Sequence, residues 1–296
     1  MKILVLRGGA LGDFIVTIPA IRWLRTQWPG ARMELVGNTR AATLGIAEGL
    51  IDATHSQHEA RWATLYGNAP LAETFRSWLE GFDLVVNYWP DPEGELAARF
   101  PLRTGQTVLA AAAMPVLAPA ARHFCEALRP LGCETVDYRS RLPLLAARAN
   151  DPDPAPIAIH PGSGSPRKNW PMDRWATLCE RLQRYASLLI VGTEIDADAL
   201  ALLAAFGEIA MNLPLPELAT RLARCRLFLG HDSGVSHLAA AVSTPCVVLF
   251  GPSDPAMWAP PGDHVHVICS VPSMNDLSLE TVWPFIQTHS ALASPK

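Results

Sequence analysis

The chain has 296 residues, of which 49% are hydrophobic and 18% are charged, and its formal net charge is −4. That length suits two domains of about 130–150 residues better than one. The composition supplies enough apolar side chains for large cores and excludes an intrinsically disordered chain. The small negative charge gives no sign of a nucleic-acid partner, which would favour a basic protein.

The first strongly apolar run, residues 3–6, is too short for the core of a signal peptide. The alanine-rich stretch 108–121 is interrupted by Pro115 and Pro119 and is too short to span a bilayer. Six cysteines are scattered without the spacing of a metal site, which indicates free thiols in a reducing compartment. We therefore expect a cytoplasmic protein with at most peripheral contact at the inner face of the membrane.

Short apolar runs alternate with longer helical patterns in the first half, which is the rhythm of a parallel α/β sheet. Residues 3–6 are apolar without alternation, as in a strand covered on both faces. Residues 53–70 lack periodicity and are predicted to form a long surface loop, a common place for substrate contacts. The other elements predicted here are helices over 14–28, 41–48 and 71–79 and strands over 33–36 and 84–86.

The segment 150–156, NDPDPAP, has three prolines in seven residues and is typical of a linker. It predicts an N-terminal domain over 1–150 and a C-terminal domain over 151–296. The second half repeats the alternation of the first, so the expected fold class is α/β with two parallel-sheet domains. Its predicted elements are strands over 157–160, 188–191, 208–212, 227–229, 246–250 and 265–268, and helices over 171–185, 195–206, 215–224, 234–242 and 276–288.

The first candidate loop is 7–13, RGGALGD, between the first strand and the first helix. Its glycines permit a close backbone approach, and the helix N-terminus attracts anions. A dinucleotide-binding fingerprint would need GxGxxG and an acid at the end of the second strand, and this sequence has neither. Asp13 has two interpretations that can both hold. It is an N-cap stabilised by the helix dipole, or a general base at the carboxyl edge of the sheet.

The second candidate loop is 160–171, HPGSGSPRKNWP, again between a strand and a helix. Arg167 and Lys168 supply positive charge, as a diphosphate cradle requires. Only three of the 24 basic side chains are lysines, and Lys168 is the one away from the termini. An exposed turn with incidental charge remains the alternative. Small residues leave backbone N–H groups accessible to a phosphate, and serines add hydroxyl donors. Among the small residues of this loop are Ser163, Gly164 and Ser165.

The third candidate loop is 230–237, GHDSGVSH. Asp232, Ser233 and Gly234 lie at the predicted helix start, where backbone amides suit a phosphate and a carboxylate suits sugar hydroxyls. The histidines and the aspartate also suggest a metal, but the pattern does not bring them together, so no metal is expected. His237 is either part of this site or a core histidine.

A fourth strand-to-turn edge, 250–255, has good turn chemistry and belongs to the same predicted sheet. Glu194 follows another strand, where it is either a ligand for ribose hydroxyls or an ordinary acid at a helix start. Two segments, 151–153 and 196–198, match the DxD pattern of metal-dependent glycosyltransferases. One lies in the linker and the other at a helix start, so neither is interpreted as a metal site.

Four stretches together resemble glycosyltransferase family nine, the heptosyltransferases of lipopolysaccharide core assembly. They cover nearly all of the second domain and the start of the first, whereas residues 50–150 carry no resemblance. The stretches are GALGDFIVTIPAIRWLR, HPGSGSPRKNWPMDRWATL, VGTE and GHDSGVSHLAAAVSTPCVVLFGPSDP.

The resemblance implies a GT-B fold, in which two Rossmann-like domains face each other across a cleft. The C-terminal domain would bind the nucleotide-sugar donor and the N-terminal domain the acceptor, and the last helix can pack back on the N-terminal domain. The implied reaction is inverting and metal-independent. It moves a heptose from ADP-heptose, a substrate rather than a cofactor, to a hydroxyl of a glycan or lipid-linked acceptor.

The resemblance assigns Asp13 as the general base and Lys168 as the catalytic cation at the donor's phosphates. The chain is short for the family in its N-terminal half, and its Arg7-Gly8-Gly9 opening departs from the commonest form of the motif. The acceptor is therefore left open. The expected donor-binding positions are Gly12, Ser163, Gly164, Ser165, Arg167, Glu194, Asp232, Ser233, Gly234 and His237.

Two other functions fit the same pair of domains. A nucleotide-sugar epimerase would convert the donor without any acceptor. A non-catalytic nucleotide-sugar-binding protein would keep Lys168 and Asp232 but would not need an acid at position 13. A dehydrogenase is disfavoured because the dinucleotide fingerprint is missing.

Overall fold

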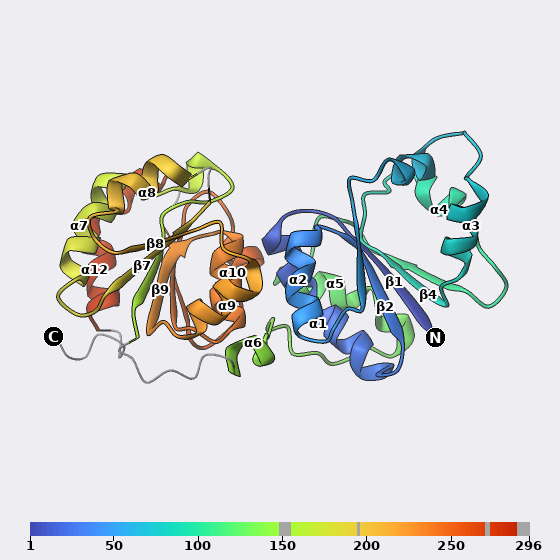
Figure 1. The fold of residues 1–296 in the computed structure, drawn as a ribbon, viewed down its shortest axis with the longest axis horizontal. Coiled ribbons are helices and arrows are strands. Elements are labelled where there is room, and N and C mark those ends of the chain that lie inside the picture. The colour runs from blue at the N-terminus through green and yellow to red at the C-terminus, as the bar shows by residue number, and fades with distance from the viewer. Residues whose placement is uncertain (148–154, 194–195, 270–272, 289–296) are drawn as a thin grey trace. The chain divides into compact units, whose positions relative to one another are not determined.

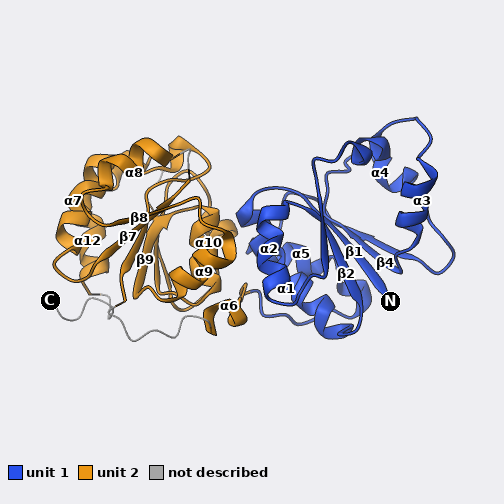
Figure 2. Cartoon of the chain, viewed as in Figure 1, with its two compact units in different colours: residues 1–138 blue, residues 139–296 orange. Residues whose placement is uncertain are grey.

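The computed structural model describes residues 1–147, 155–193, 196–269 and 273–288. The chain forms two compact units, unit 1 over Met1–Tyr138 and unit 2 over Arg139–Lys296 (Figure 2). The boundary expected at residues 150 and 151 lies slightly further along the chain. Most of the proline-rich segment 150–156 on which that expectation was based falls outside the described residues.

Unit 1 is built on a five-stranded sheet in the order β3-β2-β1-β4-β5, and every pairing is parallel (Figure 1). This is the doubly wound order 3-2-1-4-5-6 without its sixth strand. The central strand β1 is buried on both faces after its first residue, which explains its unbroken apolar run. The strands are β1 Lys2–Arg7, β2 Arg32–Gly37, β3 Ala53–Ser56, β4 Leu84–Asn87 and β5 Thr107–Ala110.

Helices cover both faces of this sheet. One face carries α1, α2 and α5, and the other carries α3, α4 and the 3₁₀ helix η1 (Figure 1). The helix α1 continues through Pro19. The bounds are α1 Leu11–Gln27, α2 Thr39–Ala47, η1 Ala60–Tyr66, α3 Glu73–Glu80, α4 Glu95–Arg99 and α5 Ala120–Glu126.

The prediction of a long surface loop over 53–70 is wrong. The segment contains β3 and η1, and Trp62 and Leu65 of η1 are buried in the core of unit 1. A four-residue strand followed by a 3₁₀ helix has neither the period of a long strand nor that of an α-helix. The same brevity hid β5, a four-residue strand that leads directly into an alanine-rich stretch.

Unit 2 contains a six-stranded parallel sheet in the order β11-β10-β9-β6-β7-β8. Counted from the start of the unit, this is the order 3-2-1-4-5-6 of a doubly wound sheet. All six strands predicted for this half are confirmed. They are β6 Ile157–His160, β7 Leu188–Gly192, β8 Glu208–Met211, β9 Leu227–His231, β10 Cys246–Phe250 and β11 Val265–Cys269.

One face of the second sheet carries α7, α8 and α12, and the other carries α9 and α10 (Figure 1). The last helix, α12, packs against α7 within unit 2. Within the ranges that the structure describes, no helix combines the length and apolar character that a bilayer crossing requires. The helices are α6 Pro143–Ala147, α7 Met172–Leu182, α8 Ala197–Leu203, α9 Leu215–Ala223, α10 Gly234–Ala241, α11 Pro255–Trp258 and α12 Leu279–Gln287.

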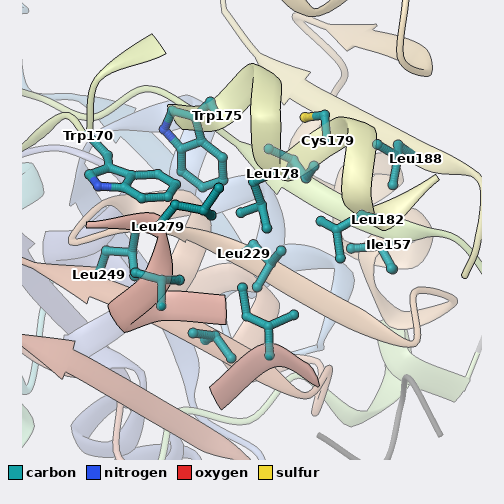
Figure 3. Close-up of a cluster of buried hydrophobic side chains, with 14 of the residues drawn as sticks. Ile157, Trp170, Trp175, Leu178, Cys179, Leu182, Leu188, Leu229, Leu249 and Leu279 are labelled. Carbon is teal, nitrogen blue, oxygen red and sulfur yellow. The ribbon is translucent and has the colours of Figure 1, made fainter. Parts of the chain in front are cut away.

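The core of unit 2 lies between the sheet and α7, where Trp170 and Trp175 meet edge to face with ring centroids 5.3 Å apart (Figure 3). The indole N–H of Trp170 donates to the carbonyl of Leu277 at 2.6 Å, so its polar atom is satisfied. This packing holds the start of α7, and with it the loop that follows β6.

Each sheet has one point where the chain reverses its direction of growth, between β1 and β4 in unit 1 and between β6 and β9 in unit 2. Ligands of open α/β sheets bind at such a point, beyond the carboxyl ends of the strands. The loops after these four strands are therefore the candidate ligand-binding loops.

Leu178 on α7 tests the core described above. Replacing this fully buried side chain by alanine should lower the free energy of unfolding by about 2–5 kcal/mol, because a cavity remains. Leu202 on α8 is 64% exposed, and Leu202→Ala should change the same quantity by less than about 0.5 kcal/mol. Urea titrations followed by tryptophan fluorescence measure both. Equal losses would contradict the placement of α7.

Candidate functional site

In unit 1 a glycine loop follows β1. Gly9 has φ +107°, and a Cβ there would lie 2.5 Å from Oδ2 of Asp13, so no other residue fits without a shift. The Gly9 N–H donates to Oε1 of Gln57 at 3.0 Å, and Nδ2 of Asn38 donates to the Gly9 carbonyl at 3.3 Å. These contacts fasten the loop to the carboxyl ends of β2 and β3.

Asp13 lies inside the first turn of α1. Ala10 occupies the N-cap position, and Oδ2 of Asp13 accepts the Ala10 N–H at 2.8 Å. The N-cap interpretation of Asp13 is therefore wrong in position, because the carboxylate reaches back from the third helical residue, as the acid of a capping box does. Its side chain remains 35% exposed and accessible to a substrate.

Arg7 holds the other carboxylate oxygen. Its Nη2 donates to Oδ1 of Asp13 at 2.9 Å, its Nε to Oγ1 of Thr17 at 3.0 Å, and its Nη1 to the carbonyl of Ala113 at 3.3 Å. Burial lowers the pKa of Arg7 and Asp13 opposes that shift, and the guanidinium stays charged. It also lies 4.4 Å from the ring centre of Phe124.

Arg7 was not among the site residues expected from the sequence. The sequence does contain an indication of its role, because an arginine at the end of a buried strand requires a partner for its charge.

In unit 2, three loops meet beyond the carboxyl ends of β6, β9 and β10. Nζ of Lys168 lies 2.6 Å from Oδ2 of Asp232, and Oγ of Ser253 donates to the same oxygen at 2.6 Å. Asp232 is almost buried, whereas Lys168 is partly exposed. The cation and acid expected at a donor site are thus brought together, and Ser253 from the fourth candidate loop joins them.

The start of α10 completes this cluster. Ser233 is the N-cap, and its Oγ accepts the N–H of Ser236 at 3.4 Å. Oγ of Ser233 also lies 3.2 Å from Nδ1 of His160, which connects β9 to β6 across the reversal point. Gly234 is the first helical residue, and His237 is buried one turn into the helix.

Several of the other expected donor residues lie in the loop after β6. Ser163 is turned into its own loop, where its Oγ contacts the Ser165 carbonyl at 2.8 Å and Oδ1 of Asn169 at 2.6 Å. Gly164 and Arg167 are exposed.

Two further residues were expected at the donor site. Glu194 lies outside the described residues, and Gly12 lies in the first turn of α1, in unit 1.

Two buried histidines support the loop after β6. Nε2 of His231 accepts the N–H of Trp170 at 2.8 Å, which assigns the ring proton to Nδ1, 3.4 Å from the Gly162 carbonyl. Burial lowers the pKa of His231 to about 3. Burial also lowers the pKa of His160 to about 4, a shift that Asp196 partly opposes. Both rings are therefore neutral at pH 7.

Asp196 shapes the same edge from β7. Oδ2 of Asp196 accepts two hydrogen bonds from Thr193, one from the backbone N–H at 2.8 Å and one from the hydroxyl group at 3.0 Å. A Cβ at Gly162 would lie 2.0 Å from Oδ1 of Asp196, so a glycine is needed there. Among the described residues, no group of three His, Cys, Asp or Glu side chains is placed to hold a metal ion. His160, Asp196 and Ser253 are structural members of the site that sequence reasoning did not assign.

The histidines give unit 2 a pH dependence. Their folded-state pKa values lie below the ordinary value of 6.5, so their contribution to stability is present at neutral pH and is lost as the pH falls from 6.5 towards 4. The slope should reach about 1.4 kcal/mol per pH unit for each ring. Urea titrations between pH 7 and 4 measure how the free energy of unfolding changes with pH. This slope should be smaller in His231→Gln than in the wild type, by the contribution of one ring. An unchanged slope would contradict a neutral, buried His231.

Comparison with known proteins places this geometry in a family. The family model described as glycosyltransferase family 9 (heptosyltransferase) matches residues 134–283. Lipopolysaccharide heptosyltransferase 1 of Pseudomonas aeruginosa is 29% identical over an alignment of 290 residues, which covers 86% of this chain and 80% of the relative. Lipopolysaccharide heptosyltransferase 1 of Escherichia coli K12 is 22% identical, with 95% of this chain and 97% of the relative covered.

Solved structures agree in fold. The E. coli heptosyltransferase WaaC with ADP-2-deoxy-2-fluoro heptose has a TM-score of 0.77 at 19% identity and covers 98% of this chain and 100% of that one. The glycosyl transferase family 9 structure from Veillonella parvula DSM 2008 has a TM-score of 0.77 at 20% identity, with 97% and 96% covered. The fold is of the GT-B type, with two Rossmann-like domains. Because the family model spans half of the sequence, the chain is a glycosyltransferase and belongs to glycosyltransferase family 9.

Proposed function

We propose that this glycosyltransferase moves a heptose from ADP-heptose to a hydroxyl group of a glycan or lipid-linked acceptor in lipopolysaccharide synthesis. The family description and the names of the relatives support heptose transfer in this pathway, and the ADP-2-deoxy-2-fluoro heptose bound to WaaC supports ADP as the carrier. The observation that carries the proposal is the cluster of Lys168, Asp232 and Ser253 at the reversal point of unit 2.

The cluster suits the diphosphate of a nucleotide sugar. The ammonium group of Lys168 has three donors and gives one to Asp232, so the others are available to phosphate oxygens. The N–H groups in the first turn of α10, which follows the N-cap Ser233, lie at the positive end of the helix dipole. They can therefore donate to phosphate oxygens. The Asp232 carboxylate fixes the position of the Lys168 ammonium group and neutralises part of its charge.

The leaving group gains negative charge as the glycosidic bond to phosphate breaks. Interactions that strengthen with that charge accelerate the reaction, and Lys168 and the start of α10 are such interactions. In this proposal they take the place that a divalent metal has in metal-dependent glycosyltransferases, so transfer is metal-independent.

Asp13 is the proposed general base. The acceptor oxygen forms a bond to the anomeric carbon from the face opposite the diphosphate, the carbon–oxygen bond to ADP breaks with its electron pair, and the hydroxyl proton passes to Asp13. Displacement from the opposite face inverts the anomeric configuration. Arg7 holds the Asp13 side chain in one orientation, and the exposed part of the carboxylate remains accessible.

Lys168→Ala tests the donor site. It should lower kcat by about 10²–10³-fold, because one preorganised positive group is lost from the leaving diphosphate. Wild-type protein should also gain about 2.7 kcal/mol of stability from ADP at 100 times its Kd, and more than from GDP or UDP at the same concentration. Arg221→Ala removes a cation paired with Glu208 on the surface of unit 2 and is the matched control. If ADP stabilised Lys168→Ala as much as wild type, Lys168 would not bind the diphosphate.

Asp13→Asn tests the general base. The amide keeps the size of the side chain but cannot take the proton, so kcat should fall by about 10²–10⁴-fold while ADP-heptose still binds. Asp52→Asn is the control, because Asp52 also pairs with an arginine, Arg25, in unit 1. Steady-state assays and calorimetric titration measure the two effects. Near-normal turnover of Asp13→Asn would remove Asp13 from the mechanism.

A further inference from the structure

His231, the last residue of β9, is completely buried and directly precedes Asp232 in the chain. Its ring meets the indole of Trp175 edge to face, with centroids 5.3 Å apart. The backbone here is also held, because the Ser236 hydroxyl donates to the His231 carbonyl. The Asp232 N–H donates to the carbonyl of Leu249 in β10 at 3.3 Å. A side chain without exposed surface cannot touch a substrate, so any effect of His231 on the reaction passes through another residue.

The His231 ring is bonded to both ends of the loop that carries Lys168. At the beginning of the loop, Nδ1–H of the ring donates to the Gly162 carbonyl at 3.4 Å. At the end of the loop, Nε2 accepts the Trp170 N–H at 2.8 Å. Among the described residues, no other group outside the loop is hydrogen-bonded to the backbone of residues 162–170. One imidazole thus fastens this loop to β9.

The other hydrogen bonds of the loop backbone are local. The Lys168 N–H donates to the Ser165 carbonyl at 2.9 Å. Oγ of Ser163 lies 2.6 Å from Oδ1 of Asn169. Lys168 itself ends a 3₁₀ helix of three residues, an element with poorer hydrogen-bond geometry than an α-helix. These bonds shape the loop internally, whereas its position relative to the sheet depends on the contacts with His231.

Two consecutive residues of β9 and the turn after it therefore contact the loop at three points. The ring of His231 holds Gly162 and Trp170, and the carboxylate of Asp232 holds Nζ of Lys168 at 2.6 Å. If the contacts of the ring are lost, the loop moves relative to the strand end that carries the carboxylate. A displacement of about 1 Å is enough to break a hydrogen bond of this length.

The neutral imidazole suits this task chemically. It has one donor nitrogen and one acceptor nitrogen on a rigid ring, and the two contacts need one of each. Phenylalanine at position 231 would keep a ring against Trp175 but would make neither hydrogen bond. Glutamine would keep an acceptor for the Trp170 N–H without the rigid ring.

We infer that His231 is a positioning residue of the donor site, which holds the loop between β6 and α7 so that Lys168 meets both Asp232 and the donor's diphosphate. The inference rests on the proposed function for the role of Lys168. It gives an indirect role in donor binding to a side chain that cannot contact the donor. The effect of His231 on donor binding should therefore depend on the presence of Lys168.

A double-mutant cycle between His231→Phe and Lys168→Ala tests this dependence, with ADP as the probe and calorimetric titration of the full chain. His231→Phe alone should raise the Kd of ADP by about tenfold, because a charged hydrogen bond to the diphosphate is misplaced. In the Lys168→Ala background the same change should alter the Kd by less than about twofold, because no cation remains to be positioned.

Two further variants separate positioning from a general loss of stability. Leu178→Ala damages the core under α7 but leaves both ends of the loop bonded, so its Kd for ADP should stay within about twofold of wild type. His231→Gln should recover part of the affinity that His231→Phe loses. It also replaces His231→Phe in the cycle if the latter does not fold. Equal Kd values for the two His231 variants, or a Leu178→Ala loss as large as theirs, would overturn the inference.

The position of Lys168 can also be observed without nucleotide, because the chain has only two other lysines, Lys2 and Lys296. In protein made with ¹³C-labelled lysine, the Hε–Cε signal that disappears in Lys168→Arg belongs to Lys168. This signal should move in His231→Phe in the same direction as in Asp232→Asn, which removes the partner of the ammonium group directly. It should stay in place in Leu178→Ala. An unmoved signal in His231→Phe would contradict the positioning role.

The ADP affinity of Lys168→Ala distinguishes the two ways in which this account can fail. If Lys168→Ala binds ADP as tightly as wild type, the proposed donor site fails. If Lys168→Ala binds ADP weakly and His231→Phe has the same effect with and without Lys168, or no effect, the inference about His231 fails alone.

Discussion

The pair of Lys168 with Asp232 is the contact on which the proposed donor site depends. It joins two loops that are more than sixty positions apart in sequence, and Ser253 adds a third loop to the same carboxylate oxygen. The parallel sheet brings the ends of these strands to one edge, and the reversal of strand order makes β6 and β9 neighbours there. The tryptophan core under α7 and the neutral rings of His160 and His231 hold that edge in shape.

Unit 1 uses a different arrangement at its own reversal point. There a single carboxylate is fixed from two sides, by Arg7 through one oxygen and by the Ala10 N–H through the other. Gly9 is required because any side chain would enter the space of Asp13. The two units thus differ in their chemistry, because unit 2 brings a cation, a carboxylate and a hydroxyl together and unit 1 has a single fixed carboxylate.

The sequence was sufficient for most strands and for the loops that form the candidate site, for a physical reason. Buried strands such as β6 and β10 are unbroken apolar runs, and polar residues that follow several such runs must gather at one edge. It was insufficient where an element is short, as for η1 and β5, because periodicity needs length.

Pairings across the fold were also out of reach. The bonds of Asp13 to Arg7 and of Ser253 to Asp232 depend on which strands are neighbours, and strand order cannot be read from local pattern.

The central claim is that the donor's diphosphate binds where the loops after β6 and β9 meet. A crystal structure of the chain with ADP tests it most directly. The account expects the β-phosphate within hydrogen-bond distance of Nζ of Lys168 and of the N–H groups at the start of α10. A diphosphate bound elsewhere, or one turned away from both groups while the adenosine occupies their place, would contradict it.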